Sequence, residues 1–294
     1  MTTGVLCMAY GSPASLEEVE PYLRSIIGRD PAPQRFAALI ERYRAIGGAS
    51  PLNQITARQT ARVGDVVGLP TAVGMKHWRP TIADAVARLI DDGCDRLIGL
   101  ALAPHYASMS IGGYERQVEQ ALADGVRFDM IRSWYGEPRF VSFAARALRD
   151  AIGDWTDARV LFTAHSLPAR ILDDGDPYLE QLMDSARLIA AEAGCSHWEF
   201  CFQSASATGE PWLGPDVLER LRTFGAAGGA RVVIAPIGFT ADHLEILYDV
   251  DIEGAMVAAE AGVTMRRTRS PNDDPTFIDA LAAVVRRALE AVVA

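Results

Sequence analysis

The sequence predicts an α/β protein built from two similar Rossmann-like lobes, each with a parallel sheet and flanking helices. Short apolar runs alternate along the chain with longer amphipathic stretches, a rhythm typical of βαβ units. The first apolar run of each half also shares one pattern: V-L-x-x-A-x-x-x-P occurs in "VLCMAYGSP" and again in "VLFTAHSLP". The length of 294 residues suits two domains, each with a core of its own.

In the first half, "GVLCMAYG" is typical of a buried strand, and "SLEEVEPYLRSII" of a helix. Ser15, with Glu18 three residues later, predicts a capping box at the start of that helix. "PQRFAALIERYRAIGG" predicts a helix that ends at a glycine pair. The remaining runs read as strand, helix and strand: "TAVGMKH", "TIADAVARLIDDG" and "RLIGLALAPH".

The second half repeats the order. Strands are predicted for "ARVLFTAHS", "HWEFCFQS" and "RVVIAPIGF", and helices for "DPYLEQLMDSARLIAAEAG", "GPDVLERLRTFGAAGG" and "PTFIDALAAVVRRALEAVV". We therefore expect lobes at residues 1–150 and 151–294, with the last helix packing back on the first lobe.

Composition argues against several classes of protein. The formal net charge is −10 and no Lys/Arg cluster stands out, so a nucleic-acid partner is not expected. No apolar run approaches the 18 residues of a membrane span, and the N-terminus has no basic, apolar signal segment. Cys7, Cys94, Cys195 and Cys201 form no C-x-x-C pair, which favours reduced thiols and a cytoplasmic protein.

Polar side chains follow the apolar runs where parallel strands would end. Tyr10, His77, His105, His165 and Glu245 all occupy such places. Ligands of open α/β sheets bind outside the carboxyl ends of the strands. The sequence therefore predicts a cleft between the lobes on which these side chains converge.

The segment "TADHLEILYDVDIEG" holds a row of acidic residues. On one α-helix, Asp242, Glu245, Asp249 and Glu253 would form a narrow stripe. Imidazole with carboxylates suits Fe(II), Mn(II), Co(II), Zn(II) or Mg(II), and the stripe is either a cation path or a solvated acidic face. Walker A, G-x-G-x-x-G, G-x-S-x-G and H-E-x-x-H motifs are absent.

Eight segments, in order across nearly the whole chain, resemble those of ferrochelatases, above all the coproporphyrin III ferrochelatases of Gram-positive bacteria. They are "MAYGSP", "RYRAIGGASPLNQIT", "GMKHWRPTI", "LAPHYASMSIGGY", "TAHSLP", "GDPYLEQL", "QSASATGEPWLGPD" and "PIGFTADHLEILYDVDIE". The resemblance implies two α/β lobes that hold a porphyrin between them. It also implies insertion of Fe(II) into coproporphyrin III, with release of two protons, in haem biosynthesis.

The resemblance implies roles for ten residues. His165 and Glu245 correspond to the catalytic pair that binds iron and accepts protons. Asp249 and Glu253 correspond to outer metal-binding positions, which also suit a bound Mg(II). Tyr10 corresponds to the axial ligand of the iron product. The other porphyrin-contacting positions are Arg42, Tyr43, Ser50, Tyr114 and His77.

The segment "SIIGRDP" departs from the family pattern. Ile26 and Ile27 stand where relatives carry a basic pair, and either Arg24 or Arg29 is a substitute for it. The preference for coproporphyrin over protoporphyrin therefore stays open. Since no cysteine follows Cys201, no [2Fe–2S] cluster is expected. We expect a monomer that makes transient contacts with neighbouring haem-pathway enzymes. The alternatives are a chelatase for another porphyrin or metal, and a non-catalytic porphyrin or haem carrier.

Overall fold

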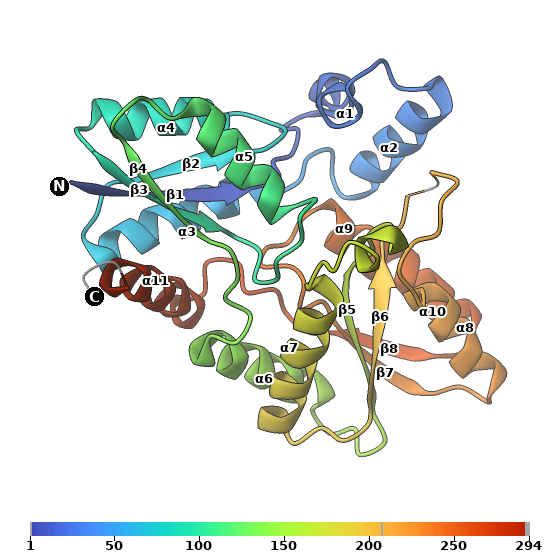
Figure 1. The fold of residues 1–294 in the computed structure, drawn as a ribbon. Helices are drawn as coiled ribbons and strands as arrows, with labels where there is room; N and C mark the ends of the chain where they lie inside the picture. Colours follow the sequence, from blue (N-terminus) through green and yellow to red (C-terminus); the bar gives the residue numbers. More distant parts are fainter. Residues whose placement is uncertain (1, 207, 292–294) are drawn as a thin grey trace. The chain divides into compact units, whose positions relative to one another are not determined.

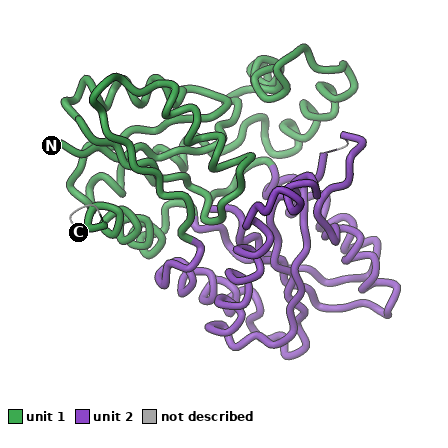
Figure 2. The backbone as a smooth tube through the Cα atoms, in the orientation of Figure 1, with its two compact units in different colours: residues 1–134, 241–244, 272–294 green, residues 135–240, 245–271 purple. Residues whose placement is uncertain are grey.

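The structure is a computed structural model that describes residues 2–206 and 208–291. Its contacts divide the chain into two compact units, drawn green and purple in Figure 2. Unit 1 consists of residues 1–134, 241–244 and 272–294, and unit 2 of residues 135–240 and 245–271. Residue 150, near which the sequence predicts a lobe boundary, lies within α6 (Pro138–Ile152), and that boundary stays a prediction.

Each unit contains one four-stranded, wholly parallel sheet (Figure 1). In unit 1 the strand order is β2-β1-β3-β4, and in unit 2 it is β6-β5-β7-β8. In both sheets the first strand in sequence lies between the second and the third, so the two units share one topology. The predicted fold class is confirmed. The strands are β1 (Thr3–Ala9), β2 (Thr71–Met75), β3 (Arg96–Ala101), β4 (Arg127–Ile131), β5 (Arg159–His165), β6 (Trp198–Gln203), β7 (Arg231–Ala235) and β8 (Thr264–Arg267).

The shared sequence pattern falls on equivalent strands. "VLCMAYGSP" begins in β1 and "VLFTAHSLP" in β5, and each of these strands pairs with two neighbours in its own sheet. Tyr10 follows the last residue of β1, and His165 is the last residue of β5. The pattern therefore marks the same position in both units.

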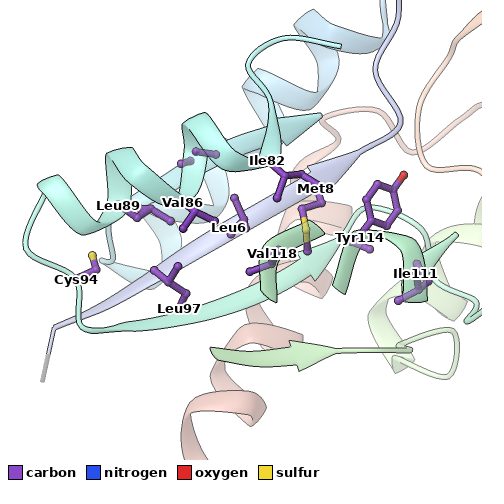
Figure 3. Packing of buried hydrophobic residues seen from close by; sticks show 13 residues of the cluster. Leu6, Met8, Ile82, Val86, Leu89, Cys94, Leu97, Ile111, Tyr114 and Val118 are labelled. Atoms are coloured by element: carbon purple, nitrogen blue, oxygen red, sulfur yellow. The ribbon is translucent and has the colours of Figure 1, made fainter. Parts of the chain in front are cut away.

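The core of unit 1 is packed between its sheet and two helices, α4 (Ile82–Asp91) and α5 (Ile111–Ala121). Leu6 and Met8 project from β1 toward Ile82 and Val86 of α4 and Val118 of α5, as Figure 3 shows. Burying side chains of this size contributes about 1.5–3 kcal/mol each. Two further helices, α3 (Leu52–Val67) and α11 (Pro275–Glu290), pack against each other and against strands of the same sheet.

Unit 2 repeats this arrangement. Leu161 of β5 and Ile234 of β7 are fully buried in a cluster with residues of α8 (Val217–Ala226) and α10 (Ala255–Glu260). The helices α6 and α7 (Tyr178–Ala193) pack against each other and against β7 and β6. Alternating strands and helices thus leave the carboxyl ends of the strands for functional groups.

A capping box is present at the start of α4, but not at Ser15, where the sequence predicts one. Thr81 caps α4, and its hydroxyl and the Asp84 carboxylate form a reciprocal capping box. The capping box predicted at Ser15 is wrong. Residues Leu16–Glu18 form a 3₁₀ turn, and α1 begins only at Val19. Glu18 instead accepts a hydrogen bond from the Ala14 amide at 2.7 Å. The tighter turn displaces the helix start by one turn.

Unit 1 also contains the helices α1 (Val19–Ile27) and α2 (Pro33–Ala45), and unit 2 contains the 3₁₀ turn η2 (Ala169–Leu172) after β5. None of the helices formed by the described residues is long and apolar enough to cross a membrane.

Buried His105 predicts a pH dependence of stability. Its side chain is 2% exposed, and burial lowers its pKa to about 3. In the unfolded chain the imidazole titrates near its ordinary pKa of about 6.5. Below that pH the unfolded state binds a proton at His105 and the folded state does not. The free energy of unfolding therefore keeps its full value above about pH 6.5 and decreases as the pH falls below it. At pH 5 the loss is about 2 kcal/mol.

The measurement is urea unfolding of wild type and His105→Gln between pH 7.5 and 4.5. The variant should be less stable at pH 7.5, yet lose less stability on acidification. Parallel curves for the two proteins would show that His105 does not carry this dependence. His197→Gln, at an exposed histidine, is the matched control and should follow wild type.

Candidate active site

The candidate site in unit 2 begins where β5 and β6 end side by side. His165 and Gln203, the last residues of these strands, are register partners across the parallel pair. The short helix α9 (Leu244–Leu247) follows β7 and carries Glu245. The carboxyl ends of three adjacent strands thus supply the side chains of the site, as the sequence predicts for parallel sheets.

Gln203 of β6 links β5 to α9 through its side chain. Its residue type alone did not predict a functional role. Its side chain is 1% exposed. Its Oε1 accepts from the Thr163 hydroxyl at 2.8 Å, and its Nε2 donates to the backbone carbonyl of Glu245 at 2.8 Å. The first bond is buried and the second is partly buried, and together they link the start of α9 to β6 and β5. The "QSASATGEP" segment was the only signal that could have found it.

His165 is oriented by a backbone carbonyl. Its Nδ1 lies against the Ser166 carbonyl oxygen. A carbonyl can only accept, so Nδ1 carries the proton and, in the neutral ring, Nε2 carries the lone pair. Nε2 is the atom that faces Glu245, at 3.6 Å from Oε1. The fold therefore selects the tautomer in which His165 can accept a proton or bind a metal.

The Nε2–Oε1 distance of 3.6 Å defines what the pair can do. Two acceptors that face each other repel unless a proton or a cation lies between them. Metal–nitrogen and metal–oxygen bonds to Zn²⁺ are about 2.0–2.2 Å long, so one divalent ion of that size fits between two atoms this far apart. Both side chains are 32% exposed, which leaves the pair open to a substrate.

Aromatic side chains support His165. The Tyr178 hydroxyl donates to the His165 backbone carbonyl at 3.0 Å, and the Trp212 ring lies 6.3 Å from the imidazole between centroids. Burial raises the pKa of Tyr178, and the negative charges of Glu245 and Asp176 raise it further. The phenol therefore stays protonated and keeps donating. Neither aromatic residue was singled out for the site by the sequence.

The acidic stripe differs from the single α-helix assumed from the sequence. Asp242 lies before α9 and outside any helix, where its Oδ2 accepts from Asn272 Nδ2 at 2.8 Å. Beyond α9 the chain forms a π-helix, η3 (Asp249–Gly254). Asp249 is 5% exposed and accepts a hydrogen bond from the Ser204 hydroxyl. The prediction of one continuous α-helical stripe is therefore wrong for Asp242.

In unit 1, Tyr10 and His77 lie together at the ends of β1 and β2. Their ring centroids are 4.6 Å apart, and the Tyr10 side chain is 41% exposed. His77 Nδ1 is 3.2 Å from the Ser25 carbonyl oxygen. Burial lowers the pKa of His77, the charge of Lys76 lowers it further, and the Ser25 carbonyl opposes both. The imidazole is therefore neutral at pH 7.

A cationic group lies beside Tyr114 on α5. Lys76 Nζ is 5.5 Å from the centroid of the Tyr114 ring and donates to the Met109 carbonyl at 2.8 Å. Burial lowers the pKa of Lys76, and the charge of Arg116 adds to the effect. Burial raises the pKa of Tyr114. Lys76 and Arg116 were not expected from the sequence as site residues, although Lys76 adjoins His77.

The remaining residues of unit 1 that were predicted to contact the porphyrin lie on or next to α2 and α3. Tyr43 is 2% exposed, with its hydroxyl 3.3 Å from that of Ser12. Ser50 is buried, and its hydroxyl accepts from the Leu52 amide at the start of α3. Arg42 is half-buried on α2.

The two candidate substitutes for the missing basic pair are both exposed. Arg24 is engaged in ion pairs with Glu20 at 3.1 Å and Asp30 at 2.8 Å. Arg29 lies in the loop after α1. Across residues 2–206 and 208–291, no group of three or more His, Cys, Asp or Glu side chains could hold a metal ion.

Solved structures share the fold at low sequence identity. The chain aligns with SirB from Bacillus subtilis with Fe³⁺ at a TM-score of 0.66 and 14% identity, over 98% of this chain and 95% of that one. CbiX, described as the terminal enzyme for biosynthesis of sirohaem in denitrifying bacteria, aligns at a TM-score of 0.52 and 16% identity, over 98% and 99% of the two chains. At these identities the likeness concerns the two-lobe fold alone.

Curated relatives cover nearly the whole chain. The ferrochelatase of Herpetosiphon aurantiacus is 44% identical over 298 residues, 96% of this chain and 98% of the relative. The coproporphyrin III ferrochelatases of Geobacillus kaustophilus and Bacillus subtilis are 43% and 39% identical, each over 97% of this chain and over 95% and 97% of their own lengths. The sequence model of the family described as Ferrochelatase matches residues 2–289. The chain belongs to the ferrochelatase family.

Proposed function

We propose that this protein inserts Fe(II) into coproporphyrin III, giving Fe-coproporphyrin III and two protons. The observation that carries the proposal is the His165–Glu245 pair, whose facing atoms are 3.6 Å apart at the carboxyl end of the unit 2 sheet. The relatives named coproporphyrin III ferrochelatases support the choice of substrate. The reaction makes the protein a lyase of haem biosynthesis.

The chemistry requires a base close to a metal ligand. A free porphyrin carries two pyrrole N–H groups, and both protons must leave as Fe(II) enters. His165, with its lone pair on Nε2, and ionised Glu245 are both acceptors that can take such protons near pH 7. The same two atoms can guide the ion before the four pyrrole nitrogens replace them. The Gln203 bond fixes the backbone of Glu245 beside His165, which favours a stable placement of the pair.

Asp249 and Glu253 are proposed as the outer positions at which hydrated Fe(II) exchanges water for protein oxygens. Carboxylates are ligands that hard and borderline divalent ions prefer. A bound Mg(II) at these residues belongs to the same proposal. Like charges four residues apart on a helix repel by a few tenths of a kcal/mol, a small cost for a cation path.

Tyr10, His77, Tyr114, Arg42, Tyr43 and Ser50 are proposed to contact the porphyrin, with Tyr10 as the axial ligand of the iron product. Coproporphyrin III carries four propionates, and a protein with a net charge of −10 must hold them with local cations. Arg42 is one candidate. Lys76 is a second, because its ammonium lies next to the Tyr114 ring.

The setting of the enzyme is proposed with its function. We expect a cytoplasmic monomer that receives coproporphyrin III from a neighbouring haem-pathway enzyme and passes its product to another. No resident cofactor and no iron–sulfur cluster take part in the proposed reaction.

The test is an anaerobic absorbance assay with Fe(II) and either coproporphyrin III or protoporphyrin IX. Metal insertion raises the symmetry of the macrocycle and reduces four visible bands to two. Collapse with coproporphyrin III, and slow or no collapse with protoporphyrin IX, is the expected result. Insertion into neither porphyrin, despite a binding-induced spectral shift, would favour the carrier. Fast insertion of another metal alone would favour a chelatase paralogue.

The acidic positions yield a separate prediction. Asp249→Asn together with Glu253→Gln should raise the KM for Fe(II) about tenfold. Mutation of residues around the primary metal ligands typically weakens metal affinity by a factor of this order or more. The kcat at saturating Fe(II) should change less. Steady-state rates over a range of Fe(II) concentrations supply both constants.

The matched control removes the same two charges elsewhere in unit 2. Glu180→Gln together with Asp184→Asn neutralises two carboxylates that also lie four residues apart, on α7. This double variant should keep the KM of wild type. An equal rise in KM for both double variants would mean that net charge, rather than a metal path, attracts Fe(II).

A further inference from the structure

The π-helix η3 changes the alignment of the acidic residues. Glu253 N donates to the Tyr248 carbonyl at 2.8 Å, five residues back, while Ile252 N shares the same carbonyl at 3.1 Å. Residues four apart on an α-helix are offset by about 40° around the axis, since 4 × 100° exceeds a full turn by that amount. The wider π-turn reduces this offset. It therefore brings Asp249 and Glu253 closer to one line along the helix than an α-helix would.

A π-turn is rare and must be held by its surroundings. Arg267, the last residue of β8, binds Asp251 in the middle of η3 through two parallel contacts. Its Nε lies 2.6 Å from Asp251 Oδ1 and its Nη2 lies 2.9 Å from Oδ2. The Arg267 side chain is 16% exposed, so this is a largely buried, bidentate pair rather than a surface contact.

Arg267 is itself held in place. Its Nη1 donates to the Thr268 carbonyl at 3.0 Å and to the Ser270 hydroxyl at 3.2 Å, so its fork has little freedom. Asp251 lies two residues from both Asp249 and Glu253, which places it on roughly the opposite side of the helix. On the other side, the Ser204 hydroxyl donates to Asp249, and Ser204 has a left-handed backbone with φ 62°. Side-chain contacts therefore hold η3 at two places, through Asp251 to Arg267 and through Asp249 to Ser204.

We infer that Arg267 is a positioning residue for metal delivery. By fixing Asp251, it holds η3 in its π-turn and so keeps Asp249 and Glu253 aligned for a divalent cation. The inference rests on the proposed metal-binding role of these two carboxylates. A lysine cannot replace the arginine, because it offers a point charge instead of a planar fork and cannot bind both carboxylate oxygens in one plane.

The experiment compares Arg267→Lys with Arg266→Lys. Both variants keep the charge, so Coulomb attraction for a cation is unchanged. Arg266 is the preceding residue of β8, but it stacks on Trp155 at 3.8 Å and bonds to the carbonyls of Ala151 and Ile152. It therefore controls for loss of an arginine contact from the same strand. The probe is Co(II) alone, titrated into porphyrin-free protein and followed by its visible absorbance.

We expect Co(II) to bind about tenfold more weakly to Arg267→Lys and unchanged to Arg266→Lys. In turnover, Arg267→Lys should raise the KM for Fe(II) and leave the kcat and the porphyrin affinity near wild type. In a Glu253→Gln background, Arg267→Lys should add little, because the residue it positions has already been altered. Asp251→Glu keeps the charge and shifts the pair by one methylene, so it should reproduce the effect.

Three results would overturn the inference: unchanged Co(II) affinity in both Arg267→Lys and Asp251→Glu, equal losses for Arg266→Lys, or full additivity with Glu253→Gln. A lower melting temperature alone, with normal Co(II) binding, would make Arg267 merely structural. If wild type binds Co(II) as expected but inserts no iron, the proposed function fails while the inference stands.

Discussion

Replacing Glu245 by glutamine should lower the kcat of Fe(II) insertion by at least about 100-fold, the lower range of what a positioned acid–base group contributes. Glutamine keeps the size of the side chain but removes its charge and its ability to take a proton. The backbone carbonyl that accepts from Gln203 is untouched, so α9 keeps its anchor. Porphyrin binding, measured by the shift of its absorbance, should be retained.

A control variant and a stability measurement test whether a loss of activity in Glu245→Gln arises from lost charge or from unfolding. Glu260→Gln, at an exposed glutamate of α10, should have wild-type turnover. Because the Glu245 side chain is partly exposed, the free energy of unfolding should change by about 1 kcal/mol or less. Normal insertion by Glu245→Gln would contradict the assignment of the pair. A loss of porphyrin binding in step with activity would instead make Glu245 a substrate contact.

Replacing His165 by alanine should have an effect of similar size. The variant loses the Nε2 lone pair that faces Glu245, and with it one ligand for the incoming ion and one acceptor for a pyrrole proton. We expect insertion to fall at least about 100-fold while the porphyrin still binds. Single-turnover absorbance with porphyrin-loaded protein measures the chemical step apart from product release.

His197→Ala is the matched control for His165→Ala, because His197 is exposed and lies at the opposite, amino end of β6. It should insert iron as wild type does. His165→Asn should not restore activity, since an amide nitrogen carries no comparable basic lone pair. Wild-type insertion by His165→Ala would show that the imidazole takes no part in the reaction.

The sequence predicted the fold well because its signals are local and repeated. Apolar runs of strand length alternate with amphipathic helices in both halves, and the structure confirms a parallel sheet in each unit. The shared V-L-x-x-A-x-x-x-P pattern located β1 and β5, the equivalent strands of the two sheets. His165 and Glu245 could be named because each follows an apolar run, and parallel strands bring their carboxyl ends together.

What the sequence could not supply depends on contacts distant in the chain. The π-turn at Asp249–Gly254 leaves no mark in residue spacing, and its contact with Arg267 of β8 joins residues that are 16 positions apart in the chain. Gln203 gains its role from Thr163 and Glu245, which are far away in sequence. Asp242 was placed on the stripe by periodicity, but its bond with Asn272 lies outside the helix. The roles of all these residues in turnover stay predictions.

In the proposed reaction, the His165–Glu245 pair accepts two protons as Fe(II) enters the macrocycle. The most direct measurement mixes Fe(II) with coproporphyrin-loaded protein in weak buffer under anaerobic conditions. Visible absorbance reports insertion, and a pH indicator reports protons in the same sample. We expect wild type to release two protons per macrocycle together with the collapse of the visible bands. In His165→Ala and Glu245→Gln, neither event should occur at a comparable rate. Equally fast proton release and insertion in both variants would contradict this role of the pair.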